Sequence, residues 1–295
     1  MGYEDLEVEE PSAEIVNMAG FKFVQQLAAD LNRGDVKLPS FPDVVMRIKR
    51  AIEQQDCNSD KLARIVSTEA ALAARLLKVA NSALMKRGGK PVKDIKTAVS
   101  RLGHEMLHTT AVSVAVEQIF LGASLKQHRE RLRGVWRDAA HVAAISYTLT
   151  RRVRCGINPD EALLAGLLHN VGKLYIIMNS SEHPEFIDDD ATLDLVVETW
   201  HGQVGRAIIE GWGFAEDKAL AAADHMDLER NASGAPDLTD VVTTAWLMAR
   251  EADGEEIHYD SARALSRLQI DEEKREQIMR ESVDDINALA QALNG

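Results

Sequence analysis

The sequence predicts an all-α fold, and three observations support that prediction. Apolar residues recur with helical spacing in nearly every segment of the 295-residue chain. Runs of alternating or β-branched residues, which are typical of strands, are scarce. Helix-start and helix-stop signals recur between the periodic segments. Apolar residues make up 45% of the chain and charged residues 27%, which is typical of a soluble globular protein.

The helices can be placed in chain order from these signals. The first clear start lies at residues 40–43, where Ser40 can cap a helix and Pro42 and Asp43 suit its first turn. Helical spacing predicts further helices over residues 59–67, 69–83, 95–102, 105–121, 126–154, 192–211, 216–226 and 239–250. Glycine and proline in the 231–236 segment predict a loop. Residues 259–292 are expected to form one or two helices with a polar face.

A second clear helix start lies at Asn158-Pro159, with proline at the first helical position and two acidic residues behind it. The segment that follows, 162–168, is apolar on nearly all sides, so we expect it at the centre of a helical bundle. It ends in the polar pair His169-Asn170. Because buried polar groups need partners, His169 should point at another polar group, at water or at a cofactor.

The charge is concentrated at the two ends of the chain. The net charge is −13, with six acidic and no basic residues in 1–14 and twelve acidic against five basic residues in 251–295. Acidic and basic residues balance between these ends. Nucleic-acid binders usually carry a surplus of Lys and Arg, so a nucleic-acid partner is not expected.

No apolar stretch is long enough to cross a bilayer, and the acidic start does not resemble a signal peptide. We therefore expect a cytoplasmic protein without a membrane partner. Neither Cys57 nor Cys155 belongs to a CxxC motif, so both are expected to be reduced and structural. The GxGxxG, GxSxG, phosphate-loop and HExxH motifs are absent. Glu198 and His201 do share one helical face, although this spacing alone is a weak metal signal.

Several segments together resemble the HDOD domain, a bacterial signalling module related to the HD-superfamily metal-dependent phosphohydrolases. The resembling segments are 38–42, 70–83, 95–103, 135–137, 165–174, 198–201, 212–214 and 224–225. The chain departs from the family at 68–70, where Thr68-Glu69-Ala70 stands in place of the usual acidic residue and proline. The resemblance implies an HD-like helical bundle with a smaller N-terminal helical bundle. It divides the chain into an acidic N-terminal extension with a helix (1–35), an HDOD domain (36–250) and an acidic C-terminal helical segment (251–295).

The resemblance also implies which residues descend from a metal site. His169, His201 and His225 correspond to histidine ligands, whereas Asn170 stands where an active HD enzyme has aspartate. An amide oxygen is neutral and binds a hard cation more weakly than a carboxylate, and it cannot neutralise a second ion.

Two further ligand positions differ from those of an active HD enzyme. The first histidine ligand is expected where this chain has Asp138, with His141 one helical turn further along. The last aspartate is expected near Ala245, whereas Asp240 lies more than a turn away. Lys173 follows the His-Asn pair and would contact a phosphate in an active enzyme. We therefore expect Asp138, His141, Asn170 and Lys173 to line a degenerate pocket.

These residues leave three functions to compare. The first is a non-catalytic regulatory or scaffold module in a signalling pathway, with a protein partner and no cofactor; a homo-oligomer is compatible with it. The second is a metal-dependent phosphohydrolase or phosphodiesterase acting on a nucleotide or cyclic dinucleotide, with a single zinc or iron ion on the three histidines. The third is a cyclic-nucleotide or nucleic-acid binder that uses a basic cluster within 126–154. That cluster comprises Lys126, His128, Arg129, Arg131, Arg133, Arg137, Arg151, Arg152 and Arg154.

Overall fold

A computed structural model describes residues 29, 42–86, 88–122, 128–180 and 190–294 of the chain. These residues form helices and no strand, so the predicted all-α fold is confirmed. The predicted helix within 1–35, most of the 38–42 motif and Lys126 lie outside the described residues. No helix in the described ranges is both long and apolar enough to span a bilayer.

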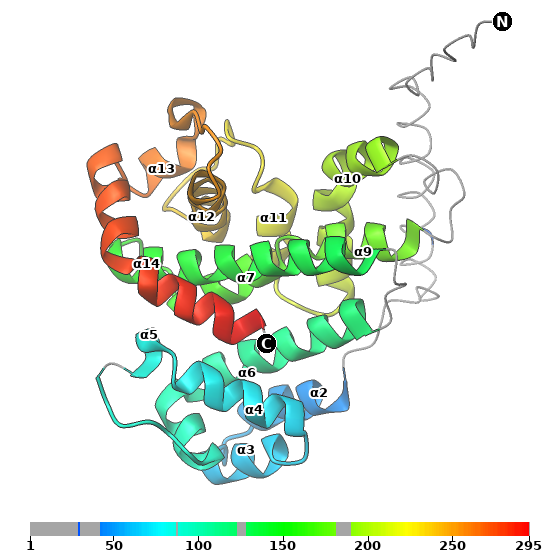
Figure 1. The fold of residues 1–295 in the computed structure, drawn as a ribbon, viewed down its shortest axis with the longest axis vertical. Helices are drawn as coiled ribbons and strands as arrows, with labels where there is room; N and C mark the ends of the chain where they lie inside the picture. Colours follow the sequence, from blue (N-terminus) through cyan, green and yellow to red (C-terminus); the bar gives the residue numbers. More distant parts are fainter. Residues whose placement is uncertain (1–28, 30–41, 87, 123–127, 181–189, 295) are drawn as a thin grey trace, which may run out of the picture.

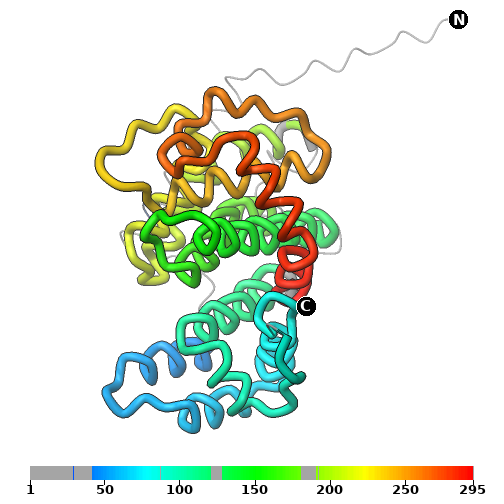
Figure 2. The backbone as a smooth tube through the Cα atoms, turned by 90° about the vertical axis from the view of Figure 1, so that its left-hand side faces the viewer, coloured from blue at the N-terminus to red at the C-terminus, as the bar shows by residue number. Residues whose placement is uncertain are grey.

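The helices form two lobes (Figures 1 and 2), with the N-terminal lobe below the main lobe in both views. The N-terminal lobe contains α2 (Asp43–Ile52), α3 (Ser59–Val66), α4 (Ala70–Ala80), α5 (Ala83–Lys86) and the start of α6 (Ile95–Gly122). The main lobe contains α7 (Arg129–Arg152), α8 (Pro159–Leu168), α9 (Val171–Asn179), α10 (Asp190–Gly211), α11 (Glu216–Asp224), α12 (Leu238–Ala252) and the short α13 (Arg263–Arg267). The long last helix, α14 (Glu272–Asn294), follows the single turn η4 (Tyr259–Ser261) and α13.

The long helix α6 bends where the sequence predicts a break between two helices. Gly103 has φ 81° and ψ 178°, which is outside the helical region. Glycine adopts positive φ without the steric penalty that a Cβ atom would introduce. The bend lets the first part of α6 pack in the N-terminal lobe while its last turns reach α8 in the main lobe.

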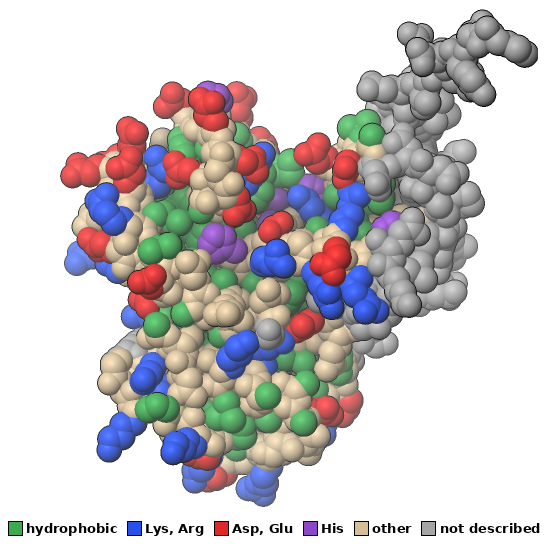
Figure 3. Space-filling view, in the orientation of Figure 1, with side chains coloured by type: hydrophobic (Ala, Val, Ile, Leu, Met, Phe, Trp, Pro, Cys, Tyr) green, Lys and Arg blue, Asp and Glu red, His purple; other side chains and the backbone are tan. Residues whose placement is uncertain are grey.

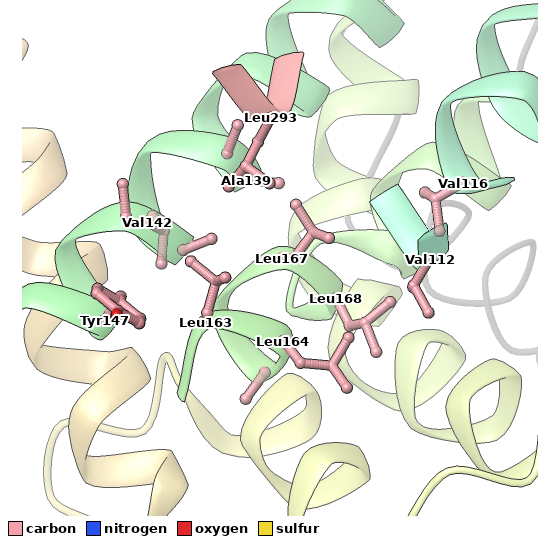
Figure 4. Close-up of a cluster of buried hydrophobic side chains, with 14 of the residues drawn as sticks. Val112, Val116, Ala139, Val142, Tyr147, Leu163, Leu164, Leu167, Leu168 and Leu293 are labelled. Carbon is pink, nitrogen blue, oxygen red and sulfur yellow. The ribbon is translucent and has the colours of Figure 1, made fainter. Parts of the chain in front are cut away.

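Helix α8 lies at the centre of the main lobe, as the sequence predicts. Every residue from Ala162 to Leu168 is buried. Figure 4 shows leucines of α8 between Val112 and Val116 of α6 on one side and Ala139 and Val142 of α7 on the other. The α8 helix therefore has no polar face, and its last residues lead directly into the buried His169-Asn170 pair.

The C-terminal helix α14 joins the two lobes. It packs against α7 in the main lobe and against α4, α5 and α6 beneath it. Ile286, Leu289 and Leu293 are buried in that seam, and the Arg75 guanidinium donates to the carbonyl oxygen of Leu293. The acidic segment 251–295 is thus docked on the rest of the chain, while the division into domains at 35 and 250 stays a prediction.

Candidate functional site

Three histidines that are distant in the sequence meet inside the main lobe. His169 caps the C-terminal end of α8, His201 lies within α10, and His225 caps the C-terminal end of α11. All three side chains are buried. The ring centroids of His169 and His225 are 4.9 Å apart, and those of His201 and His225 are 5.4 Å apart. We call these three residues the histidine cluster.

The helices fix the proton on each of these rings. Nδ1 lies 2.6 Å from the carbonyl oxygen of Gly166 in His169, 2.7 Å from that of Val197 in His201, and 3.0 Å from that of Ala222 in His225. A carbonyl oxygen only accepts, so Nδ1 must carry the hydrogen in each ring, and a neutral ring then presents Nε2 as an acceptor. All three Nε2 atoms are buried without a hydrogen-bond partner among the described residues.

Burial keeps the histidine cluster neutral. Loss of hydration lowers the pKa of His169 to about 3 and that of His201 to about 4. Burial also lowers the pKa of His225 well below the ordinary value, and the other two histidines lower it further. At neutral pH the cluster therefore presents three acceptor nitrogens and no positive charge.

The close packing of α9 on α10 depends on Gly172. A Cβ atom at this position would lie 2.0 Å from the carbonyl oxygen of His201 and 2.7 Å from the amide nitrogen of Gly205. The two helix backbones therefore touch directly, without side chains between them. This contact brings the turn that carries His169 and Asn170 beside His201.

A cavity of about 250 Å³ lies next to the histidine cluster. Asp138, His141, Asn170 and Lys173, the predicted pocket residues, all line this cavity together with His169. His201 and His225 are not among its lining residues; the His225 ring contacts that of His169, and the His201 ring contacts that of His225. The remaining lining residues are Val142, Glu198, Met226, Trp246, Ala249, Arg250, Asp253 and Glu255.

The charged groups that line the cavity range from partly buried to exposed: Lys173 and Arg250 are partly buried, whereas Asp138, Glu198, Asp253 and Glu255 are exposed. Burial raises the pKa of Asp138, and the negative charge of Asp253 raises it further. Burial lowers the pKa of Lys173, while the charges of Asp138 and Glu198 oppose that shift. The Oδ1 atom of Asn170 is buried without a partner in the described part of the chain.

Helix α12 supplies one wall of the cavity, and the sequence alone did not identify this wall. The guanidinium of Arg250 stacks over the Trp246 ring at 4.8 Å, and its Nε donates to Glu255 at 2.8 Å. Asp253 follows directly after the helix. The four-residue spacing of Trp246 and Arg250 on one helical face was the available signal.

The residues present do not fit a two-ion hydrolytic centre of the HD type. Asp240 is buried, but its Oδ2 accepts from Arg267 and from the backbone of Asp237, at 2.9 Å each. Asn170 offers a neutral oxygen in place of a bridging carboxylate. Within the described ranges, no group of three or more His, Cys, Asp or Glu side chains is spaced to hold a metal ion.

The described residues of the basic cluster predicted within 126–154 are spread along the length of α7 and beyond its end. Arg137 and Arg151 are 14 residues apart on α7, which is roughly 20 Å along a helix axis. Several of its members are also paired with acidic residues: Arg131 with Asp194, Arg133 with Glu130 at 2.7 Å, and Arg152 with Glu281 at 3.0 Å. This arrangement weakens the third of the three functions.

Comparisons with known proteins agree with this fold. An uncharacterized protein of Treponema pallidum (strain Nichols) is 26% identical over 257 residues, which are 81% of this chain and 47% of that protein. The chain thus spans about half the length of this curated relative.

Solved structures extend the comparison to nearly the whole chain. A "Putative metal-dependent phosphohydrolase" from Shewanella amazonensis SB2B superposes with a TM-score of 0.77 at 27% identity, covering 94% of this chain and 99% of that one. An HDOD domain protein with unknown function from Geobacter sulfurreducens shares the fold with a TM-score of 0.65 at 22% identity, covering 92% and 99%. The family model of the HDOD domain matches residues 38–228. This chain therefore belongs to the HDOD domain family.

Proposed function

We propose that this HDOD protein is a non-catalytic regulatory or scaffold module of bacterial signalling, acting in the cytoplasm through a protein partner. The observation that carries the proposal is Asn170, which lies on the cavity wall with a buried, unpaired Oδ1 atom where hydrolysis requires a carboxylate. In this proposal His169, His201 and His225 form a vestigial metal site. The pocket around them then serves as a structural or ligand-sensing feature.

The ion pairs that Asp240 makes with arginines also support a non-catalytic function. Its carboxylate pairs with Arg267 and lies 3.7 Å from Arg230, so this aspartate serves the packing of α12. In the part of the chain that the structure describes, no set of three or more His, Cys, Asp or Glu side chains, with or without the histidine cluster, is grouped to hold a metal ion. Three neutral imidazoles cannot balance the charge of two divalent ions.

The test is metal analysis combined with a turnover assay. We expect the purified protein to contain well under one equivalent of zinc, iron or manganese, and to hydrolyse neither bis-p-nitrophenyl phosphate nor cyclic dinucleotides when these metals are added. Asn170→Asp restores the missing carboxylate and should raise metal content above that of the wild type. Stoichiometric metal in the wild type, with turnover that His169→Ala abolishes, would contradict the proposal.

A second candidate is a metal-dependent phosphohydrolase, which the same assay can detect. Asp138 and Glu198 line the cavity beside His169, so a carboxylate could reach a single ion held by imidazole nitrogens. The Shewanella protein, similar over most of both chains, carries a name of this class. If this candidate is correct, Glu198→Gln should reduce turnover at least tenfold. Glu256→Gln, outside the cavity, should leave turnover unchanged.

A further inference from the structure

We propose that the cavity beside the histidine cluster binds a small organic cation, such as a protonated amine, rather than a phosphate-bearing ligand. The inference rests on the proposed non-catalytic function and names the class of ligand that the pocket would sense. Four properties of the cavity support it: the polarity of its innermost atoms, the charge of its walls, an aromatic surface and its size.

Two buried polar atoms of the residues that line the cavity are acceptors. The hydrogen bond from His169 Nδ1 to the carbonyl oxygen of Gly166 leaves Nε2 with a lone pair, and the Asn170 Oδ1 atom is a carbonyl oxygen. Both atoms are buried and lack a partner among the described residues. An acceptor buried without a donor costs about 1–3 kcal/mol, so a ligand that donates hydrogen bonds is favoured here. The ionised oxygens of a phosphate only accept, so they would worsen this position.

The walls add more negative than positive charge. Four carboxylates line the cavity, those of Asp138, Glu198, Asp253 and Glu255, against the two cations Lys173 and Arg250. Arg250 is already engaged by Glu255. The charge of Asp253 raises the pKa of Asp138, which means that these two carboxylates repel each other across the site. A bound cation would relieve this repulsion, whereas an anion would increase it.

The aromatic residue of the cavity, Trp246, already attracts one cation of the chain. The Arg250 guanidinium lies over its ring, 4.8 Å from the centroid, so a ligand cation would compete with Arg250 for this face. Indole is the strongest of the aromatic side chains in attracting a cation to its face. Figure 3 shows acidic side chains gathered around the end of the main lobe formed by α12 to α14.

The size of the cavity favours a small molecule over a bare ion or a nucleotide. Its volume of about 250 Å³ is below the roughly 300–1,000 Å³ of pockets for drug-sized ligands. A single metal ion would need ligands converging on one point, and no such group occurs in the described ranges. The carboxylates are instead spread over helices α7, α10 and the residues after α12, as two or more donors on one ligand would require.

The experiment uses the full chain and three probes: 1,4-diaminobutane, the uncharged butane-1,4-diol, and inorganic phosphate. Binding is measured by isothermal titration calorimetry and by the shift of the thermal unfolding midpoint, with the protein treated with EDTA beforehand. We expect the diamine to bind and to raise the midpoint, and the diol and phosphate to do neither. Glu198→Gln should weaken diamine binding about tenfold, the loss expected for one charge-assisted hydrogen bond.

Lys173→Met distinguishes the two ligand classes best, because the substitution should change their binding affinities in opposite directions. Removing this ammonium should tighten diamine binding several-fold, whereas it would weaken the binding of a phosphate. Glu256→Gln, an exposed carboxylate outside the cavity, is the matched control and should leave binding unchanged. Diamine binding no stronger than diol binding would overturn the inference, as would phosphate binding that Lys173→Met weakens. Neither result requires metal-dependent turnover, which is the observation that would overturn the proposed function.

Discussion

Two buried polar centres lie in the main lobe, and they differ in how their polar atoms are satisfied. Asp240 is 3% exposed, and its oxygens accept from Arg267 and the backbone and lie near Arg230. Asn170 is 4% exposed, and its Oδ1 atom has no partner among the described residues, like the Nε2 atoms of the histidine cluster. Burial is the same in the two centres, but hydrogen bonding is complete in one and incomplete in the other.

This difference separates a polar group that stabilises the fold from one that is available to a ligand. The carboxylate of Asp240 also completes the capping box at the start of α12 with Asp237. Removing it should therefore cost stability. Asn170 contributes no such bond through Oδ1, so its removal should cost little. We therefore expect substitutions of Asp240 to reduce stability, and substitutions of Asn170 to affect ligand binding instead.

The largest effect on stability is expected from pH, because the folded chain holds the three histidines in their neutral form. Unfolded histidine binds a proton below about pH 6.5, whereas His201 has a folded-state pKa of about 4. The contribution of these neutral histidines to the unfolding free energy should be fully present above pH 6.5 and decrease as the pH falls. At pH 4 the loss from His201 alone should be about 3 kcal/mol. Urea unfolding at a series of pH values measures this slope.

His201→Gln should reduce that slope, since a glutamine takes up no proton. His258→Gln, on an exposed residue after α12, is the control for losing an imidazole from the surface. Equal slopes for the wild type and His201→Gln would show that the buried ring does not carry the pH dependence.

The next largest effect is expected from Asp240→Asn. The substitution leaves the partly buried Arg267 and Arg230 without their shared anion, so the unfolding free energy should fall by about 3 kcal/mol. Urea denaturation measures the loss, and Asp284→Asn on the exposed face of α14 is the matched control. A loss below about 1 kcal/mol would remove the basis for treating this centre as structural.

A smaller effect is expected from Arg230→Lys. The guanidinium binds both carboxylate oxygens of Asp237, at 3.0 and 2.8 Å. Lysine keeps the charge but loses this two-point contact, so the unfolding free energy should fall by about 1 kcal/mol. The same denaturation assay measures it, and an unchanged midpoint would mean that charge alone suffices.

The smallest effect on stability is expected from Asn170→Leu. Leucine has the same branching at Cγ and removes an unsatisfied acceptor, and the adjacent cavity can accept its larger volume, so the unfolding free energy should stay constant or rise by about 1 kcal/mol. Asn170→Asp, which has the same shape and adds a charge, should instead lower it. A marked loss of stability in Asn170→Leu would mean that Oδ1 has a partner in solution that stabilises the folded chain.

Local patterns predicted most of the fold. Helical periodicity located the helices, the break near Gly103 was predicted, and the apolar 162–168 segment is central. Helix α9 was not predicted, because it begins directly after Asn170 without a side-chain cap. The predicted helix 69–83 ends earlier, at Ala80, where the Asn81 side chain turns to bond Val92. The docking of α14 depends on contacts between residues as distant as Arg75 and Leu293, which periodicity does not encode.

The candidate site was predictable only in part. His169 stood out because a polar pair ended an apolar helix, while His201 and His225 were identified through the family resemblance. The cavity brings His169 together with Asp138, His141, Asn170 and Lys173. The role of Trp246 and Arg250 depends on how α12 packs beside α7 and α11, which is a tertiary property without a local signature.

The geometry of the histidine cluster depends on the absence of a Cβ atom at Gly172. Even alanine would push a methyl group into the peptide of His201 and wedge α9 away from α10. Such a wedge would pull the lone pairs of two histidines apart without altering any polar residue. A substitution at this position could therefore disrupt the pocket although every side chain that lines it is unchanged. A comparison of the lining residues alone would not detect such a change.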